Sequence, residues 1–109
     1  MSIKKVAITV FADPGHAWGR VRKSVLIALG INQSISTYSY MRGDYAYLEE
    51  DRDLYVLIVA LKRNNIPFDI TERFANGDSK IRRYDRYKSD ATFNQESDAR
   101  CEYSWGADL

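Results

Sequence analysis

The sequence has a single histidine, His16, and a single cysteine, Cys101, among its 109 residues. One cysteine excludes an internal disulfide, and the two residues together provide fewer ligands than the usual zinc cage requires. A catalytic triad or a Cys-His pair would also depend on His16, and Cys101 lies in a polar carboxy-terminal segment that offers no rigid support. We therefore expect no catalytic residue, no metal site and no cofactor.

Long apolar runs are absent as well. No segment approaches the roughly 20 apolar residues that cross a bilayer. The apolar run from Val6 to Ala12 is short, and it leads into Asp13-Pro14-Gly15 rather than a small-residue cleavage site. These features, together with the near absence of cysteine, predict a soluble cytoplasmic protein that has no membrane partner.

What the chain does contain is typical of one small globular domain, with 45% hydrophobic and 28% charged residues. The net charge is only +1, yet basic residues prevail in 1–30 and 79–88, and acidic residues prevail in 44–53 and 89–109. We predict a single α+β domain over 1–88 and a loosely held polar tail over 89–109.

Hydrophobic periodicity predicts the element order β, short β, α, β, β, α, β. Ser24 is expected to cap the first helix, and Gly30 is expected to end it. The other expected elements are strands at 4–12 and 20–23, a hairpin within 36–48, a helix over 51–65 and an edge strand over 66–74. This order favours an antiparallel sheet of about four strands with two helices packed on one face.

The hairpin carries four tyrosines at alternating positions. Tyr38 and Tyr40 precede the turn at Gly43, and Tyr45 and Tyr47 follow it. Successive strand residues face opposite sides, so either two-residue loop that contains Gly43 places Tyr40 opposite Tyr45 or Tyr47. All four rings then share one face, which either lies beneath the helices or is exposed as a binding surface.

The helix over 51–65 has more apolar residues than one packed face requires. Its main stripe begins at Leu54 and repeats at the i+3, i+4 and i+7 positions, whereas Tyr55, Val56 and Val59 lie outside that stripe. Either the sheet and other elements bury the whole helix, or these three residues form the interface of a homodimer.

Acidic residues gather just before this helix and in its first turn, at Glu49, Glu50, Asp51 and Asp53. Negative charge at this end is favoured by the helix dipole. Carboxylates are also the ligands that magnesium prefers, which keeps a small metal-dependent nuclease open as an alternative.

Basic and aromatic residues alternate in the segment 79–88. Its members are Lys80, Arg82, Arg83, Arg86 and Lys88, interleaved with Tyr84 and Tyr87. Guanidinium groups bind phosphate and carboxylate, and tyrosines stack on bases. The segment is therefore expected to bind nucleic acid, to bind an acidic protein, or to pair internally with Glu49, Glu50 and Asp51 while Ile81 and Tyr84 pin it to the sheet.

Several motifs resemble a family of short proteins encoded by bacteriophages, prophages and plasmids. They are Ser-Thr-Tyr-Ser-Tyr at 36–40, Gly-x-x-Ala-Tyr-Leu-Glu-Glu-Asp at 43–51, Ser-Lys-Ile-Arg-Arg-Tyr-Asp-Arg-Tyr at 79–87 and an early Asp-Pro-Gly-His-Ala-Trp at 13–18. Together they cover residues 11–88, and the tail has no counterpart. The resemblance implies a mobile-element setting in the cytoplasm of a bacterial host cell, where such small proteins commonly block a host complex, as anti-CRISPR proteins do.

The main expectation is a non-enzymatic protein that binds and inhibits a bacterial defence complex, either a host protein or a ribonucleoprotein. A single-stranded DNA or RNA-binding accessory protein of phage replication or regulation is the alternative from a different class. The residues expected to bind the partner are Tyr38, Tyr40, Tyr45, Tyr47, Glu49, Glu50, Lys80, Arg82, Arg83 and Arg86. Tyrosine and arginine lead this set because they are enriched at interface hot spots.

Overall fold

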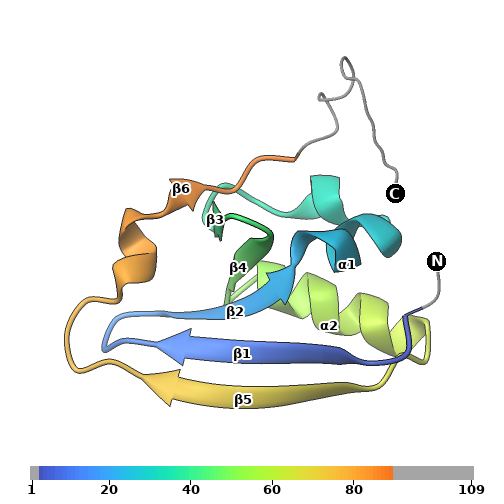
Figure 1. Ribbon diagram of the computed structural model, residues 1–109, viewed down its shortest axis with the longest axis horizontal. Coiled ribbons are helices and arrows are strands. Elements are labelled where there is room, and N and C mark those ends of the chain that lie inside the picture. The colour runs from blue at the N-terminus through green and yellow to red at the C-terminus, as the bar shows by residue number, and fades with distance from the viewer. Residues whose placement is uncertain (1–2, 90–109) are drawn as a thin grey trace.

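The computed structural model describes residues 3–89, which build a six-stranded mixed sheet and two α-helices (Figure 1). The strands are β1 (Val6–Ala12), β2 (Ala17–Arg22), β3 (Tyr40–Arg42), β4 (Tyr45–Glu49), β5 (Phe68–Phe74) and β6 (Asp85–Arg86). The helices are α1 (Lys23–Ala28) and α2 (Asp53–Arg63), with short 3-10 helices η1 (Asn32–Ser34) and η2 (Lys80–Arg83). The predicted α+β class is confirmed.

The strands lie in the order β5-β1-β2-β4-β3-β6, and the pair β1 and β5 is parallel whereas the other neighbours are antiparallel. The prediction of an antiparallel sheet of about four strands is therefore confirmed only in part, because the sheet has six strands and β5 pairs with β1 in parallel. Two antiparallel steps give β1 and β4 the same direction, and α2 then returns the chain, so that β5 enters parallel to β1. β6 has two residues, too few for a hydrophobic period.

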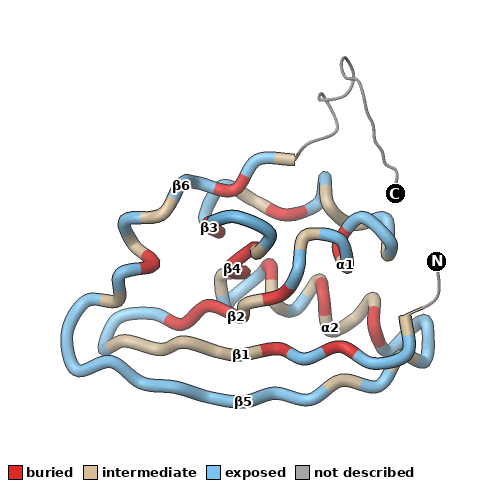
Figure 2. Tube along the Cα trace, viewed as in Figure 1, coloured by how far each residue is buried: buried red, intermediate tan, exposed pale blue. Residues whose placement is uncertain are grey.

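Both helices pack on one face of the sheet, as predicted, and the main core lies between the helices and the sheet. Its buried members are Val6, Ile8, Val21, Leu26, Ile35, Ala46, Leu48, Leu57, Leu61 and Tyr87. α2 approaches β2 closely at Gly19, where an added Cβ would lie 2.6 Å from Cδ1 of Leu54. Figure 2 shows buried segments along β1, β2, β4 and α2, whereas β5 is almost entirely exposed.

The ends of the helices differ in part from the prediction. α1 is preceded by Arg22 without a side-chain cap, so the expected cap at Ser24 was wrong, whereas Gly30 has a φ of 73° and ends the helix as predicted. α2 begins later than expected because Glu49 accepts hydrogen bonds from the N–H groups of Asp51 and Arg52, which form the turn before the helix.

The tyrosine hairpin has the predicted shape. Gly43, with a φ of 58°, and Asp44 form its two-residue loop, and Tyr40 lies opposite Tyr47. Tyr38 precedes β3 and is not part of the strand, so three of the four rings belong to the paired strands.

Two further predictions concern segments beyond the sheet. Within residues 3–89, no helix is both long and apolar enough to cross a bilayer. The predicted tail over 89–109, which includes Cys101, lies outside the described residues except for Ser89.

Candidate functional site

The sheet face that points away from the helices is rich in arginine and aromatic residues. The strand register places Phe11 opposite Trp18, Arg20 opposite Tyr47 and Arg22 opposite Tyr45, all on this side. We call it the arginine–aromatic face, and it comprises Phe11, Trp18, Arg20, Arg22, Tyr40, Arg42, Tyr45, Tyr47, Arg82, Tyr84 and Arg86. Ile81 is buried against it, so η2 rests on this face while α1 and α2 cover the other.

Each arginine of this face lies over an aromatic ring. The guanidinium carbon of Arg86 is 4.8 Å from the centroid of Tyr40, and that of Arg20 is 4.9 Å from Tyr45 and 5.3 Å from Phe11. The other contacts are Arg22 with Tyr45 at 5.1 Å, Arg42 with Tyr84 at 5.1 Å and Arg82 with Trp18 at 5.2 Å. Since about one such contact is usual in 70 to 80 residues, their gathering on one face marks it as a distinct surface.

The rings beneath the arginines form a second, smaller core. Trp18, Tyr40 and Tyr47 are buried together with Ile81, and Phe11, Tyr45 and Tyr84 are partly buried beside them. Burial raises the pKa of the Tyr47 phenol, and the neighbouring Arg20 works against that rise. The buried rings have little solvent-accessible area. The guanidinium groups that lie over them therefore form the outer layer of this face.

Four of these arginines have no carboxylate partner in the part of the chain that the structure describes; they are Arg20, Arg22, Arg42 and Arg86. Internal pairing with Glu49, Glu50 and Asp51, one of the three interpretations of the basic segment, is therefore wrong for Arg86, which donates to the carbonyl of Thr37 at 3.1 Å. It is also wrong for Arg82, which pairs with Asp13 at 2.8 Å.

Asp13 holds η2 against the sheet. Its carboxylate accepts hydrogen bonds from the N–H groups of Gly15, His16 and Ser79 and from Nε and Nη2 of Arg82. These donors, Arg82 first, keep the pKa of Asp13 well below its ordinary value. The carboxylate has no accessible surface although it lies in a peripheral loop, because the donors themselves cover it.

The acidic residues before α2 serve local structure rather than forming one cluster. Glu50 accepts from the N–H of Ala17 at 3.1 Å. Asp53 is fully buried and accepts from the hydroxyls of Ser36 and Ser39 and from Arg52. Among residues 3–89 no group of three or more His, Cys, Asp or Glu side chains is placed to hold a metal ion.

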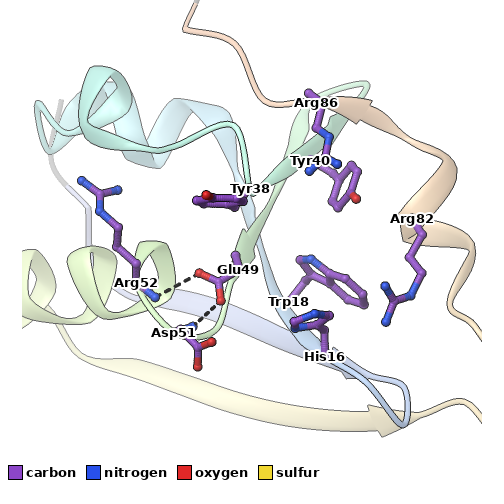
Figure 3. Close-up of a pocket in the computed structure, with 9 residues that line it drawn as sticks. All are labelled: His16, Trp18, Tyr38, Tyr40, Glu49, Asp51, Arg52, Arg82 and Arg86. Carbon is purple, nitrogen blue, oxygen red and sulfur yellow. Dashed lines mark hydrogen bonds between the residues drawn. The ribbon is translucent and has the colours of Figure 1, made fainter.

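A cavity of about 500 Å³ adjoins the arginine–aromatic face. It is lined by His16, Trp18, Tyr38, Tyr40, Glu49, Asp51, Arg52, Arg82 and Arg86. Figure 3 shows Tyr38 and Glu49 between Arg52 on one side and the rings of Trp18 and Tyr40 on the other. Tyr38 is 69% exposed, so it is the aromatic ring here with the most surface for a ligand.

The structure brings together only part of the predicted partner-binding set. Tyr40, Tyr45, Tyr47, Arg82 and Arg86 lie on the arginine–aromatic face, and Tyr38 and Glu49 lie in the adjoining cavity. Lys80 and Arg83 are exposed on η2, whereas Glu50 supports β2. Tyr87, which the sequence suggested as a stacking residue, is buried in the main core.

The residues of the predicted dimer interface lie on the helix side of the molecule. Tyr55 is exposed, and Val56 and Val59 are half-buried around a shallow depression that Leu29 and Ile31 complete. This surface is thus separate from the arginine–aromatic face.

Sequence reasoning missed Arg20, Arg22 and Arg42 as site residues. The signal was present, because Trp18, Arg20 and Arg22 alternate within one strand and so share a face. What the chain order concealed is that this face continues into the tyrosine hairpin through the pairing of β2 with β4.

No protein-family model, curated protein or solved structure matches this chain. The resemblance to mobile-element proteins therefore remains a prediction from the quoted motifs, and function must be argued from the site.

Proposed function

We propose that this protein binds single-stranded nucleic acid along the arginine–aromatic face. The observation that carries the proposal is a set of four arginines that each lie over an aromatic ring and have no carboxylate partner among residues 3–89, namely Arg20, Arg22, Arg42 and Arg86. A guanidinium that lies over a ring still has N–H groups that can donate to phosphate, and arginine side chains also stack on nucleobases.

Pre-ordering strengthens this argument. A free arginine loses rotamer freedom when it binds, whereas a guanidinium that already rests on a ring has lost part of that freedom on folding. Three strand spacings separate β2 from β6 in the sheet order, a width of about 14 Å at about 4.8 Å per spacing. The arginines thus form a row rather than a single anion site, which suits a chain of phosphates.

A single strand fits better than a duplex. Sequence-reading proteins commonly insert a helix into the major groove, but α1 and α2 lie on the opposite side of the sheet. An open sheet with aromatic and cationic groups accepts a strand whose bases are unstacked. The cavity at Tyr38 adds a place for one base, with an exposed ring for stacking.

Inhibition of a bacterial defence complex stays a prediction from the motif resemblance. The same face would also fit the nucleic-acid component or an acidic surface of such a complex, because both present rows of oxygen anions. Binding of a free oligonucleotide is the simpler property, and it can be measured without knowledge of the host.

Fluorescence anisotropy with labelled single-stranded DNA, single-stranded RNA and duplex DNA tests the proposal. The intact protein is expected to prefer single strands, and its affinity should fall steeply with salt because each phosphate contact releases counterions. No binding to any oligonucleotide at low salt would overturn the proposal.

A charge-matched pair of variants locates the site. Arg20→Gln with Arg22→Gln removes two charges from the face, and Lys62→Gln with Arg63→Gln removes two exposed charges from the end of α2. We expect the first variant to lower the salt slope by about 1.4, since each single-strand phosphate contact contributes about 0.7. The second should leave it nearly unchanged. Equal losses in both variants would show attraction by overall charge alone.

A further inference from the structure

We infer that two copies of this chain pair through the outer edge of β5, with the two β5 strands antiparallel about a two-fold axis at Thr71. Within residues 3–89, β5 is an edge strand whose one neighbour is β1, and its seven residues form a regular strand. The sheet's other edge, β6, has only two residues. A short edge strand disfavours pairing between molecules, whereas a long regular edge strand presents N–H and C=O groups with which a second chain can pair.

Hydrogen bonds at both ends of β5 show which of its peptide groups point toward β1. Pro67 accepts from Val6 at 3.0 Å, and Ala75 donates to Ala12 at 2.8 Å, so both ends of the strand direct odd-numbered residues toward β1. In a parallel pair, alternate residues point their N–H and C=O groups to the same side. The even-numbered residues, Phe68, Ile70, Glu72 and Phe74, therefore point theirs to the open edge.

The sequence of β5 is complementary to itself in the reverse direction. With Thr71 on the axis, Asp69 lies opposite Arg73 of the second copy, and Phe68 lies opposite Phe74. Opposite charges and aromatic rings are the cross-strand pairs that stabilise antiparallel sheets. The same register makes Ile70 and Glu72 a hydrogen-bonded pair with free peptide groups on both sides.

Exposure points to the same register. Phe74 is 79% exposed and Ile70 is 45% exposed, whereas Phe68 is partly buried against the main core. Pairing would place the second copy's Phe74 beside Phe68 and so extend the core across the axis. Asp69 is already held by Lys5 at 2.6 Å near the edge, where the second copy's Arg73 would meet it.

Pairing would also join the two binding faces. A two-fold axis perpendicular to the sheet keeps both arginine–aromatic faces on one side, with Arg73 of each copy between them, because Arg73 shares the side of Phe11. This consequence rests on the proposed function, but the pairing itself does not.

Disulfide trapping tests the pairing and its register in the full chain with Cys101→Ser. Thr71 would face itself in a non-hydrogen-bonded pair, whose Cα separation of about 4.5 Å falls within the disulfide range. Thr71→Cys is therefore expected to form a covalent dimer under mild oxidation. Asp69→Cys and Arg73→Cys should each crosslink poorly alone and efficiently when mixed, which collision between exposed thiols would not produce.

Charge reversal supplies a second measurement without cysteine. Asp69→Arg places like charges across the axis and should raise the dimer dissociation constant by about tenfold in analytical ultracentrifugation. Arg73→Asp added to Asp69→Arg should restore it. The inference is overturned if the wild type is a monomer and Thr71→Cys traps no covalent dimer. It is also overturned if Tyr55→Lys dissociates a dimer that Asp69→Arg leaves intact, because the copies would then pair through the α2 surface.

Discussion

The two faces of this sheet are built from the same strands, but one face packs in the main core and the other carries arginine and aromatic residues. The face under α1 and α2 buries Val21, Ala46 and Leu48, whereas residues one step away, Arg20, Tyr45 and Tyr47, belong to the arginine–aromatic face. The alternation of a β-strand divides each strand between a core and a surface. The division implies that changes in the main core should alter stability, whereas changes of the outer arginines on the second face should mainly alter binding.

The largest effect is expected on the helix side. Leu57→Ala removes a fully buried side chain of the main core and should lower the free energy of unfolding by about 2 to 5 kcal/mol in urea denaturation. Arg20→Gln on the other face removes two cation–π contacts and should cost about 1 to 2 kcal/mol, at about 0.5 to 1 kcal/mol for each exposed contact.

Equal losses of stability from these two variants would break the comparison, because the arginine–aromatic face would then be a structural layer. The binding assay completes the test. Arg20→Gln should weaken oligonucleotide binding, and Leu57→Ala should not do so at temperatures where that variant remains folded.

A smaller, pH-dependent effect is expected at Asp13, which joins η2 to the sheet. Because its pKa is lowered in the folded state, its contribution is fully present above the unfolded value of about 3.9 and is lost as the pH falls toward the folded value. The difference in unfolding free energy between wild type and Asp13→Asn should therefore be largest near neutral pH and should shrink below about pH 4.

Asp44 in the β3–β4 turn is the control for this measurement. It is exposed, and Asp44→Asn should change the unfolding free energy by no more than about 0.5 kcal/mol at neutral pH, as is usual for a surface substitution. A difference for Asp13→Asn that is constant from neutral to acid pH would mean that the carboxylate charge does not hold η2.

Local features of the fold could be predicted from the sequence, whereas long-range pairing could not. Gly43 and the alternating tyrosines identified the hairpin, and the Leu57 and Leu61 stripe identified α2, because turns and helices depend on neighbouring residues. The place of β5 beside β1 depends on the path of α2 across the sheet, which no local pattern encodes.

The site follows the same rule. Arg82 was singled out by its sequence neighbours, but its partner Asp13 is far from it along the chain. The internal pairing considered from the sequence was instead with Glu49, Glu50 and Asp51, as one of three alternatives. Arg20 and Arg22 escaped notice because their significance comes from Tyr45, which the sheet brings beside them. The sequence thus indicated that arginine and tyrosine form the site, whereas strand pairing determined which of these residues lie together.

The smallest effects on stability are expected for two arginines of the same basic segment, Arg86 and Arg83, which should differ in their effect on binding. Arg86 lies over Tyr40 and donates to Thr37 on the arginine–aromatic face, whereas Arg83 is exposed on η2. Each arginine-to-alanine change should alter the unfolding free energy by no more than about 1 kcal/mol, since both side chains are at the surface. Arg86→Ala should nevertheless weaken oligonucleotide binding by about tenfold, the loss of one charge-assisted phosphate contact, and Arg83→Ala should change it less than twofold or so. Anisotropy titrations of both variants at one salt concentration make this comparison, because the lost charge is identical and only its position differs. If Arg83→Ala weakens binding as much as Arg86→Ala does, the ligand responds to the total charge of the segment rather than to the row of guanidinium groups that lie over the rings of the sheet.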